Sequence, residues 1–149
     1  GLFTQLFSAQ VGDTGWVYAV DIAPRFLKHL YAEAAKKKRK NITGVLCNEN
    51  STNLPANSVD VAFICDTYHH FEFPAETMAS IHRALKKNGH LIMIDFNRIE
   101  GLTREWLMDH VRANKETFRS EIEAVGFKLE TEKKIDGFKE NYFLKFIKK

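Results

Sequence analysis

The feature that most constrains the fold is an alternation of short apolar runs with amphipathic segments of helical period. Apolar runs of strand length lie at residues 16–20, 42–47, 59–65 and 91–94. Helical segments that begin at Pro24 and Pro74 separate the first run from the second and the third from the fourth. Proline suits the first turn of a helix. Strands that alternate with helices in this way form βαβ units. The sequence therefore predicts an α/β domain with a parallel sheet.

The two ends of the chain complete this pattern. A first helix is expected near residues 2–7, and Asn88-Gly89 should end the helix that begins at Pro74. After the fourth apolar run, helices are expected at 104–111 and 115–125 and strands at 127–134 and 142–147. The connection between these last strands is too short for a crossover helix, so they should pair antiparallel.

Length and composition favour one domain. The 149 residues are 44% hydrophobic, which is enough for one substantial core, and residues 1–149 are expected to form a single domain. No apolar run approaches the roughly 20 residues that cross a bilayer, and the first residues do not resemble a signal peptide. A cytoplasmic protein without a membrane span is therefore expected.

Charge and cysteine usage exclude several classes of site. The net charge is only +3, and the basic run at residues 36–40 follows a predicted helix, whose carbonyl end attracts cations. A solvated helix end is favoured over a nucleic-acid patch, so no nucleic-acid partner is expected. Cys47 and Cys65 lie in apolar runs without a CxxC partner, which indicates core thiols. No metal site is predicted.

Polar residues follow each predicted strand, where an open α/β sheet binds its ligand. Asp21 follows the first run, Asn48 and Glu49 the second, residues 66–70 the third, and Asp95 the fourth. Asp21 lies twenty residues after Gly1, the separation at which a carboxylate binds the ribose of a nucleoside. The alternative is that Asp21 caps the helix that follows.

Five segments of the chain, taken in order, carry a resemblance to a known family. They are Gly1-Leu-Phe-Thr, Gly15-Trp-Val-Tyr-Ala-Val-Asp21-Ile-Ala-Pro24, Leu54-Pro55-Ala-Asn-Ser-Val-Asp60, Asp66-Thr-Tyr-His-His-Phe71 and Ile81-His-Arg-Ala-Leu-Lys-Lys-Asn-Gly89. Together they resemble class I S-adenosylmethionine-dependent methyltransferases of the ubiquinone/menaquinone methyltransferase-like group. The resemblance covers essentially the whole chain and implies a Rossmann-like, doubly wound, mostly parallel sheet with a C-terminal antiparallel hairpin. It also implies methyl transfer from S-adenosylmethionine to a small-molecule acceptor, with S-adenosylhomocysteine as product.

The resemblance assigns cofactor-binding roles residue by residue. Gly1 is similar to the last glycine of the family's glycine-rich turn, and Asp21 to its ribose ligand. Asn48 or Glu49 occupies the region that holds the adenine amino group, where the family more often has aspartate after glycine and this chain has Cys47-Asn48-Glu49. The full set of expected cofactor-binding residues is Gly1, Asp21, Ile22, Asn48, Glu49 and Asp66.

Catalytic residues are expected after the third strand. His69 and His70 are the candidate bases, since a histidine has a pKa near neutrality. The alternative is that both only shape the pocket. Tyr68 and Asp95 are expected to line the substrate pocket, although Asp95 could instead bind the loop beyond its strand. His82 and His110 fall within predicted helices and are expected to be structural or exposed.

Two further expectations concern the whole molecule. A glycine-rich turn and a central first strand are expected upstream of Gly1, between the strands that end at Val20 and Cys65. Without that strand, a second copy of the chain could supply the pairing as a homodimer. The competing functions are a non-catalytic methyltransferase-like partner subunit and a nicotinamide-dependent enzyme.

Overall fold

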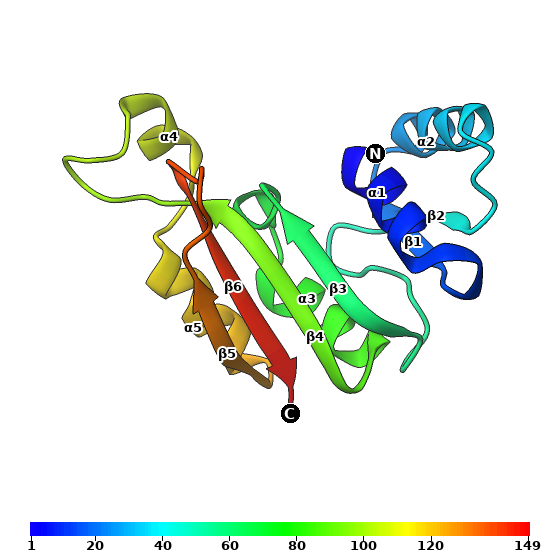
Figure 1. The fold of residues 1–149 in the computed structure, drawn as a ribbon. Helices are drawn as coiled ribbons and strands as arrows, with labels where there is room; N and C mark the ends of the chain where they lie inside the picture. The colour runs from blue at the N-terminus through cyan, green and yellow to red at the C-terminus, as the bar shows by residue number, and fades with distance from the viewer. The chain divides into compact units, whose positions relative to one another are not determined.

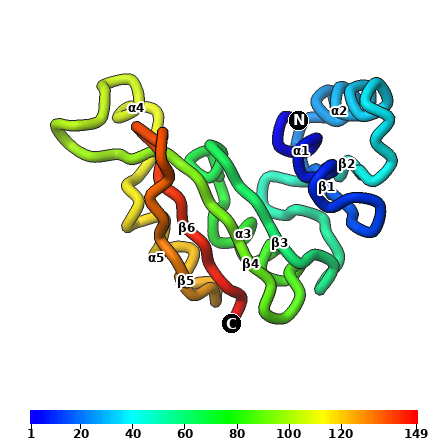
Figure 2. The backbone as a smooth tube through the Cα atoms, in the orientation of Figure 1, coloured from blue at the N-terminus to red at the C-terminus, as the bar shows by residue number.

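The computed structural model describes residues 1–149, which form two compact units at residues 1–53 and 54–149. Each unit has its own β-sheet, and Figures 1 and 2 show the path of the chain through both. The parallel strands, the intervening helices and the C-terminal antiparallel pair confirm the predicted Rossmann-like α/β fold. That residues 1–149 make one domain stays a prediction.

The first unit is a two-stranded parallel sheet with two helices. Strands β1 and β2 run in register from the pair Val17 and Ile42 to the pair Asp21 and Leu46. Leu30 and Ala34 of α2 pack on Ile42 of β2 and form its small core. The elements are α1 (Leu2–Val11), η1 (Gly12–Thr14), β1 (Val17–Asp21), α2 (Pro24–Lys36) and β2 (Ile42–Leu46).

Asn41 joins three parts of this unit just before β2 begins. Its Nδ2 donates to the carbonyl oxygens of Ser8, Gly12 and Gly15 at 3.1, 2.9 and 3.3 Å. The hydroxyl of Ser8, which is buried, donates to the Asn41 side-chain oxygen. One amide therefore ties the end of α1 and the turn of η1 to the start of β2.

The second unit is a four-stranded mixed sheet in the order β3-β4-β6-β5. Strands β3 and β4 are parallel, whereas β6 is antiparallel to both of its neighbours. β1 pairs only with β2, and β3 pairs only with β4. The elements are β3 (Val59–Cys65), η2 (Tyr68–His70), α3 (Pro74–Ala84), β4 (Leu85–Phe96), α4 (Glu105–His110), α5 (Lys115–Ala124), β5 (Phe127–Lys133) and β6 (Asn141–Lys148).

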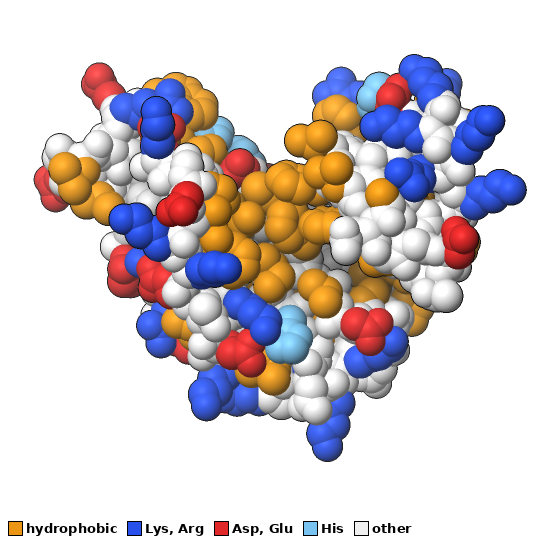
Figure 3. Space-filling view, viewed as in Figure 1, with side chains coloured by type: hydrophobic (Ala, Val, Ile, Leu, Met, Phe, Trp, Pro, Cys, Tyr) orange, Lys and Arg blue, Asp and Glu red, His pale blue; other side chains and the backbone are white.

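Helices α3 and α5 cover one face of this sheet and form the main core (Figure 1). Met78, Phe118 and Phe146 are fully buried there. Alternate residues of the strands point to the opposite face, where Val61, Ile92 and other apolar side chains are partly exposed. Figure 3 shows hydrophobic side chains gathered on that face over β3 and β4.

The end of one helix differs from the sequence prediction. Helix α3 ends at Ala84, so Asn88-Gly89 does not terminate it. Asn88 instead adopts a positive φ of 62° within the segment Leu85–Phe96, because the chain turns there before β4 runs beside β3. Phe26 and Tyr31 of α2 are exposed, and Leu30 and Ala34 are the buried residues of that helix. No helix is both long and apolar enough to cross a membrane.

Candidate active site

In the first unit, four of the five predicted cofactor residues lie at or after the carboxyl ends of β1 and β2. Asp21 ends β1 opposite Leu46, so Asp21 and Ile22 share one edge of the sheet with the loop that contains Asn48 and Glu49. Ile22 and both loop residues are exposed. A parallel sheet thus places an acceptor-rich loop beside an aspartate, as the sequence predicted.

Asp21 also takes part in local structure. Its Oδ1 accepts a hydrogen bond of 2.8 Å from the backbone N–H of Ala23, the residue that precedes α2. This bond reaches the N–H of the N-cap residue itself, and no side chain caps the first turn of α2, so the structure does not show the capping role considered for Asp21. The bond engages one of the two carboxylate oxygens, and a change to asparagine keeps an oxygen for it while removing the charge.

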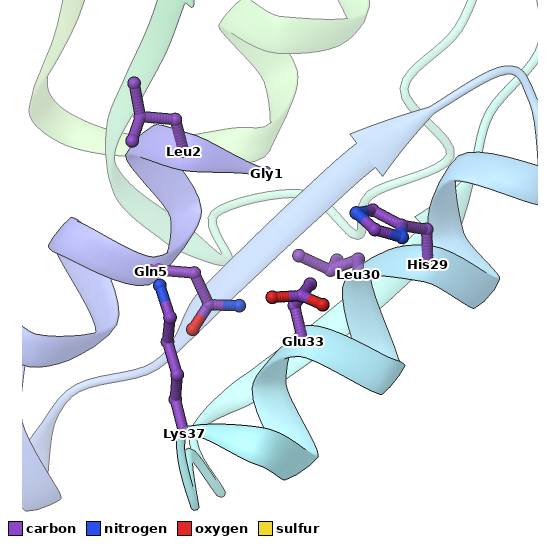
Figure 4. Close-up of a pocket in the computed structure, with 7 residues that line it drawn as sticks. All are labelled: Gly1, Leu2, Gln5, His29, Leu30, Glu33 and Lys37. Atoms are coloured by element: carbon purple, nitrogen blue, oxygen red, sulfur yellow. The ribbon is translucent and has the colours of Figure 1, made fainter.

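Gly1 lies beside α2 at the start of α1. A Cβ at this position would come within 3.2 Å of Leu30 Cδ1, so the absence of a side chain permits the close approach. Gly1 also lines a cavity of about 200 Å³ between α1 and α2, where the amide of Gln5 is buried without a hydrogen-bond partner (Figure 4). None of the other predicted cofactor residues lines this cavity.

In the second unit, His69, which follows β3, contacts Asp95 at the carboxyl end of β4. Asp95 Oδ1 lies 2.6 Å from His69 Nδ1, and the two side chains are 0% and 1% exposed. Asp95 Oδ2 accepts from the His69 backbone N–H at 3.2 Å, and Oδ1 accepts from the Phe96 N–H at 2.8 Å. These bonds favour a carboxylate that holds His69 with its proton on Nδ1. The Nε2 lone pair then points away from Asp95.

Two further histidines face that lone pair. His110, the last residue of α4, places its Nε2 3.2 Å from His69 Nε2. His70 follows His69 in η2, and its ring centroid lies 4.1 Å from that of His69 and 4.8 Å from that of His110. Burial lowers the pKa of His70, and the neighbouring imidazoles of His69 and His110 lower it further. Both His70 and His110 are exposed, so the cluster opens to solvent.

Aromatic side chains surround the three imidazoles. Trp106 stacks on His110 with a centroid distance of 4.8 Å and an interplanar angle of 14°. Phe96 contacts His69 at 5.8 Å between ring centroids. These two aromatic side chains add apolar surface beside the cluster.

Asp66 follows β3 at the same edge of this sheet. Its φ of 49° is unusual for a residue other than glycine, and Asn141 Nδ2 donates to its carboxylate at 2.8 Å. Burial raises the pKa of Asp66, and the nearby carboxylate of Asp95 adds to the effect. The bond from Asn141 holds the carboxyl group beside the start of β6.

Asp95 and Tyr68, the residues predicted for the substrate pocket, are both buried. The side chain of Tyr68 packs edge-on against Phe118 in the core, and its hydroxyl donates to Glu121 at 2.9 Å. Tyr68 therefore presents no surface to a substrate in this conformation. Asp95 is engaged by His69, so it can act on a substrate only through that histidine. The Phe96 N–H that donates to Asp95 belongs to the last residue of β4, so this bond is not the predicted one to the loop beyond the strand.

The sequence did not predict that His110 belongs to the histidine cluster. It was expected to be structural or exposed, and it is exposed, but it also contacts His69 across a sequence separation of 41 residues. The available signal was its position after Asp95, in a helix that also contains Trp106. His82 fits its expected structural role, because its ring packs edge-on against Phe127.

Comparison with known proteins adds the family. The family model described as "Methyltransferase domain" matches residues 1–93, while a search of curated proteins finds no match. The chain is similar to an S-adenosylmethionine-dependent methyltransferase from Aquifex aeolicus, with 22% identity, 96% of this chain and 74% of that chain covered, and a TM-score of 0.84.

Two other solved structures show how widely this fold is used. The [4+2]-cyclase SpnF gives a TM-score of 0.83 with 11% identity, over 99% of this chain and 71% of that one. A putative methyltransferase in complex with the Trm112 methyltransferase activator of Haloferax volcanii gives 0.73 with 13% identity, over 89% and 72%. At these identities the likeness shows the fold alone, and the fold does not fix the reaction.

The family match and the methyltransferase neighbours together identify S-adenosylmethionine as the cofactor and S-adenosylhomocysteine as its product. The matched segment contains β1, β2, β3 and most of β4, whereas Asp95 and His110 lie beyond its end. Because the family model matches more than half of the chain, this protein belongs to the methyltransferase-domain family.

Proposed function

We propose that this protein is an active enzyme that transfers the methyl group of S-adenosylmethionine to a small-molecule acceptor, as ubiquinone/menaquinone methyltransferase-like enzymes do. The observation that carries the proposal is the buried Asp95–His69 pair, joined to the exposed His70 and His110 at the ends of β3 and β4. A carboxylate that orients a histidine toward an open face is a recurring arrangement for proton transfer.

The residues of the first unit suit the cofactor by their chemistry. We assign Asp21 to the ribose hydroxyls, because a carboxylate accepts two hydrogen bonds from such a diol. Asn48 or Glu49 supplies an acceptor for the adenine amino group, and exposed Ile22 supplies an apolar contact for the base. Gly1, which has no side chain, completes the assignment in this unit. The cofactor role of Asp66, in the second unit, stays a prediction from the sequence. When bound, the cofactor supplies a methyl group on a sulfonium, an already activated leaving group.

The chain's own task is then to position the acceptor and remove its proton where the acceptor needs this. His70 is exposed and receives the proton directly in this proposal. His69 is almost fully buried, so it exchanges a proton only through its neighbours His70 and His110. Asp95 acts as a positioning residue, because it fixes the orientation of His69 and balances the charge that an imidazolium would carry.

The surroundings of the cluster support a small acceptor over a nucleic acid. Arg104 forms a bidentate ion pair with Glu140 at 2.6 and 2.9 Å, and Arg112 forms one with Glu121 at 2.8 and 2.6 Å. The arginines nearest the cluster in sequence are thus already paired with carboxylates. A phosphate backbone is bound by unpaired cations, whereas an aromatic frame suits a largely apolar molecule.

The competing function is a non-catalytic methyltransferase-like partner subunit. The Haloferax volcanii neighbour was solved in complex with a methyltransferase activator, so a protein of this fold can be part of a complex. The exposed histidine cluster favours catalysis, because a purely structural subunit does not need an oriented imidazole that opens to solvent. The cytoplasmic location and the homodimer stay predictions from the sequence.

Turnover tests the proposal. The purified protein is incubated with S-adenosylmethionine and a panel of phenolic, carboxylic, amine and thiol acceptors, and S-adenosylhomocysteine is measured by mass spectrometry. With an acceptor found, His69→Ala and His70→Ala should each lower kcat about 100-fold, the scale of general-base catalysis. His90→Ala is the control, since His90 lies within β4, five residues before Asp95, and pairs with Glu130. Unchanged rates in both variants would remove the histidines from the mechanism. Cofactor binding without any turnover would favour the partner subunit.

A further inference from the structure

The three histidines also have the arrangement of a metal site. Their ligand nitrogens all lie within 4.8 Å of one another, and they come from η2 and from the end of α4. We propose that His69, His70 and His110 bind one divalent transition-metal ion of the zinc class, with Asp95 orienting His69 from behind. This inference goes beyond the proposed function, because cation binding does not depend on methyl transfer.

The closest pair of nitrogens already has the required spacing. Two imidazole nitrogens that bind one tetrahedral zinc ion at about 2.0–2.1 Å lie about 3.4 Å apart. His69 Nε2 and His110 Nε2 are 3.2 Å apart. Without a metal, this contact needs a proton between the two nitrogens. With a metal, both lone pairs point at the same cation.

Asp95 supplies the support that metal-bound histidines usually have. A ligating histidine almost always donates its other ring N–H to a carboxylate or carbonyl, which fixes its tautomer and raises its basicity. His69 Nδ1 lies 2.6 Å from Asp95 Oδ1, and backbone N–H groups hold both oxygens of Asp95. The buried negative charge also favours a cation over a neutral ligand at this edge.

Small rotations of the two exposed histidines can complete the site. His70 and His110 are exposed, so their rings can rotate to shorten the longer nitrogen separations. Trp106 stacked on His110 limits the orientations of that ring and keeps it over the cluster. Three imidazoles leave a fourth tetrahedral position open on the exposed side, as in catalytic rather than structural zinc sites.

The donor set selects the class of metal. Imidazole ligands suit zinc, copper, nickel and iron, whereas magnesium and calcium prefer oxygen ligands. The metal and the proton acceptor would use the same imidazole lone pairs, so the two roles exclude each other at any one nitrogen. With a metal bound, the open position could lower the pKa of a coordinated hydroxyl or thiol acceptor. That step rests on the proposed function, but the binding of the metal does not.

Binding of Zn²⁺ and Co²⁺ to the chelator-treated, full-length chain tests the site. Calorimetry with Zn²⁺ should show one ion per chain, and Co²⁺ should give the visible absorption bands of tetrahedral coordination. His70→Ala and His110→Ala should each weaken Zn²⁺ binding at least 10-fold, and Asp95→Asn about 10- to 100-fold, as for other supporting residues. His90→Ala should bind as the wild type does, since its ring pairs with Glu130 outside the cluster.

Because Asp95 is buried, the Zn²⁺ affinity of Asp95→Asn is interpreted only if the circular dichroism spectrum of this variant matches that of the wild type. The exposed His70 and His110 make the test independent of that variant. Wild-type affinity in the double variant His70→Ala/His110→Ala would overturn the site, as would the absence of one-to-one binding. A thiolate charge-transfer band with Co²⁺ would also overturn it, by assigning the ion to Cys47 or Cys65. These titrations contain no cofactor, so their failure leaves the proposed methyl transfer to its own test.

Discussion

His69 and Asp95 form a fully buried imidazole–carboxylate pair whose nitrogen and oxygen lie 2.6 Å apart. The pair connects the segment after β3 to the end of β4, and it is supported by two backbone N–H groups. A buried carboxylate is stable only when hydrogen bonds replace its lost water. The geometry of the histidine cluster therefore depends on this one contact.

Asp95→Asn should destabilise the second unit. The asparagine amide would place a donor against an N–H group that now donates to the carboxylate, which leaves a buried polar group unsatisfied. The expected loss in the free energy of unfolding is about 1–3 kcal/mol. Urea unfolding followed by circular dichroism measures it, with Asp136→Asn in an exposed loop as the matched control. Equal stability of the two variants would show that Asp95 is not held as described.

Asn41→Ala should destabilise the first unit. The substitution removes the donor to three carbonyl oxygens and leaves the buried hydroxyl of Ser8 without its acceptor. We expect a loss of about 1–3 kcal/mol and faster amide hydrogen exchange in α1. Asn50→Ala, at an exposed loop position, is the control. If α1 exchanges at the wild-type rate in both variants, Asn41 does not anchor that helix.

Glu121 should make the second unit sensitive to acid. The hydrogen bond from Arg112 outweighs burial and holds the pKa of the Glu121 carboxyl below its ordinary value of 4.5. Because the folded pKa is depressed, this stabilisation is present above the ordinary value and is lost as the pH falls through the folded pKa. Glu121→Gln should cost about 1 kcal/mol at neutral pH, and this difference should shrink below the ordinary pKa.

Unfolding free energies measured across the acid range test this expectation. Glu116→Gln is the control, since Glu116 lies in the first turn of the same helix and is exposed. A Glu121→Gln deficit that stays constant down to strongly acidic pH would show that the lost stability does not come from the titration of this carboxyl.

Much of the fold follows from the sequence because its signals are local. The apolar run from Val59 to Cys65 matches β3 at both ends, and Pro24 and Pro74 begin α2 and α3 as predicted. These patterns depend on residues that are neighbours in the chain. The end of α3 was misplaced because the pairing of Val59 with Leu85 draws the chain into the strand segment before Asn88-Gly89 is reached.

The site was less predictable, because its contacts are long-range. His110 joins His69 only after β4, the following loop and α4 have folded back over the sheet edge. Tyr68 lies next to His69 in sequence, yet the turn of η2 directs it into the core toward Phe118. Neighbouring residues in a tight turn point in different directions, so sequence position alone does not assign side chains to a site.

The assignment of the cofactor and of Asp21 as its ribose ligand is tested most directly by calorimetric titration of the protein with S-adenosylhomocysteine, with NAD as the comparison ligand. We predict one-to-one binding of S-adenosylhomocysteine, no heat of binding with NAD, and at least 10-fold weaker S-adenosylhomocysteine binding by Asp21→Asn. That variant keeps an oxygen for the Ala23 N–H but loses the charge-assisted bonds to the ribose, which are worth about 1.5–3 kcal/mol. Asp13→Asn, an exposed change in η1 before β1 begins, should bind as the wild type does. Equal affinity of the wild type and Asp21→Asn for S-adenosylhomocysteine would contradict the ribose assignment. Binding of NAD in place of S-adenosylhomocysteine would contradict the cofactor assignment.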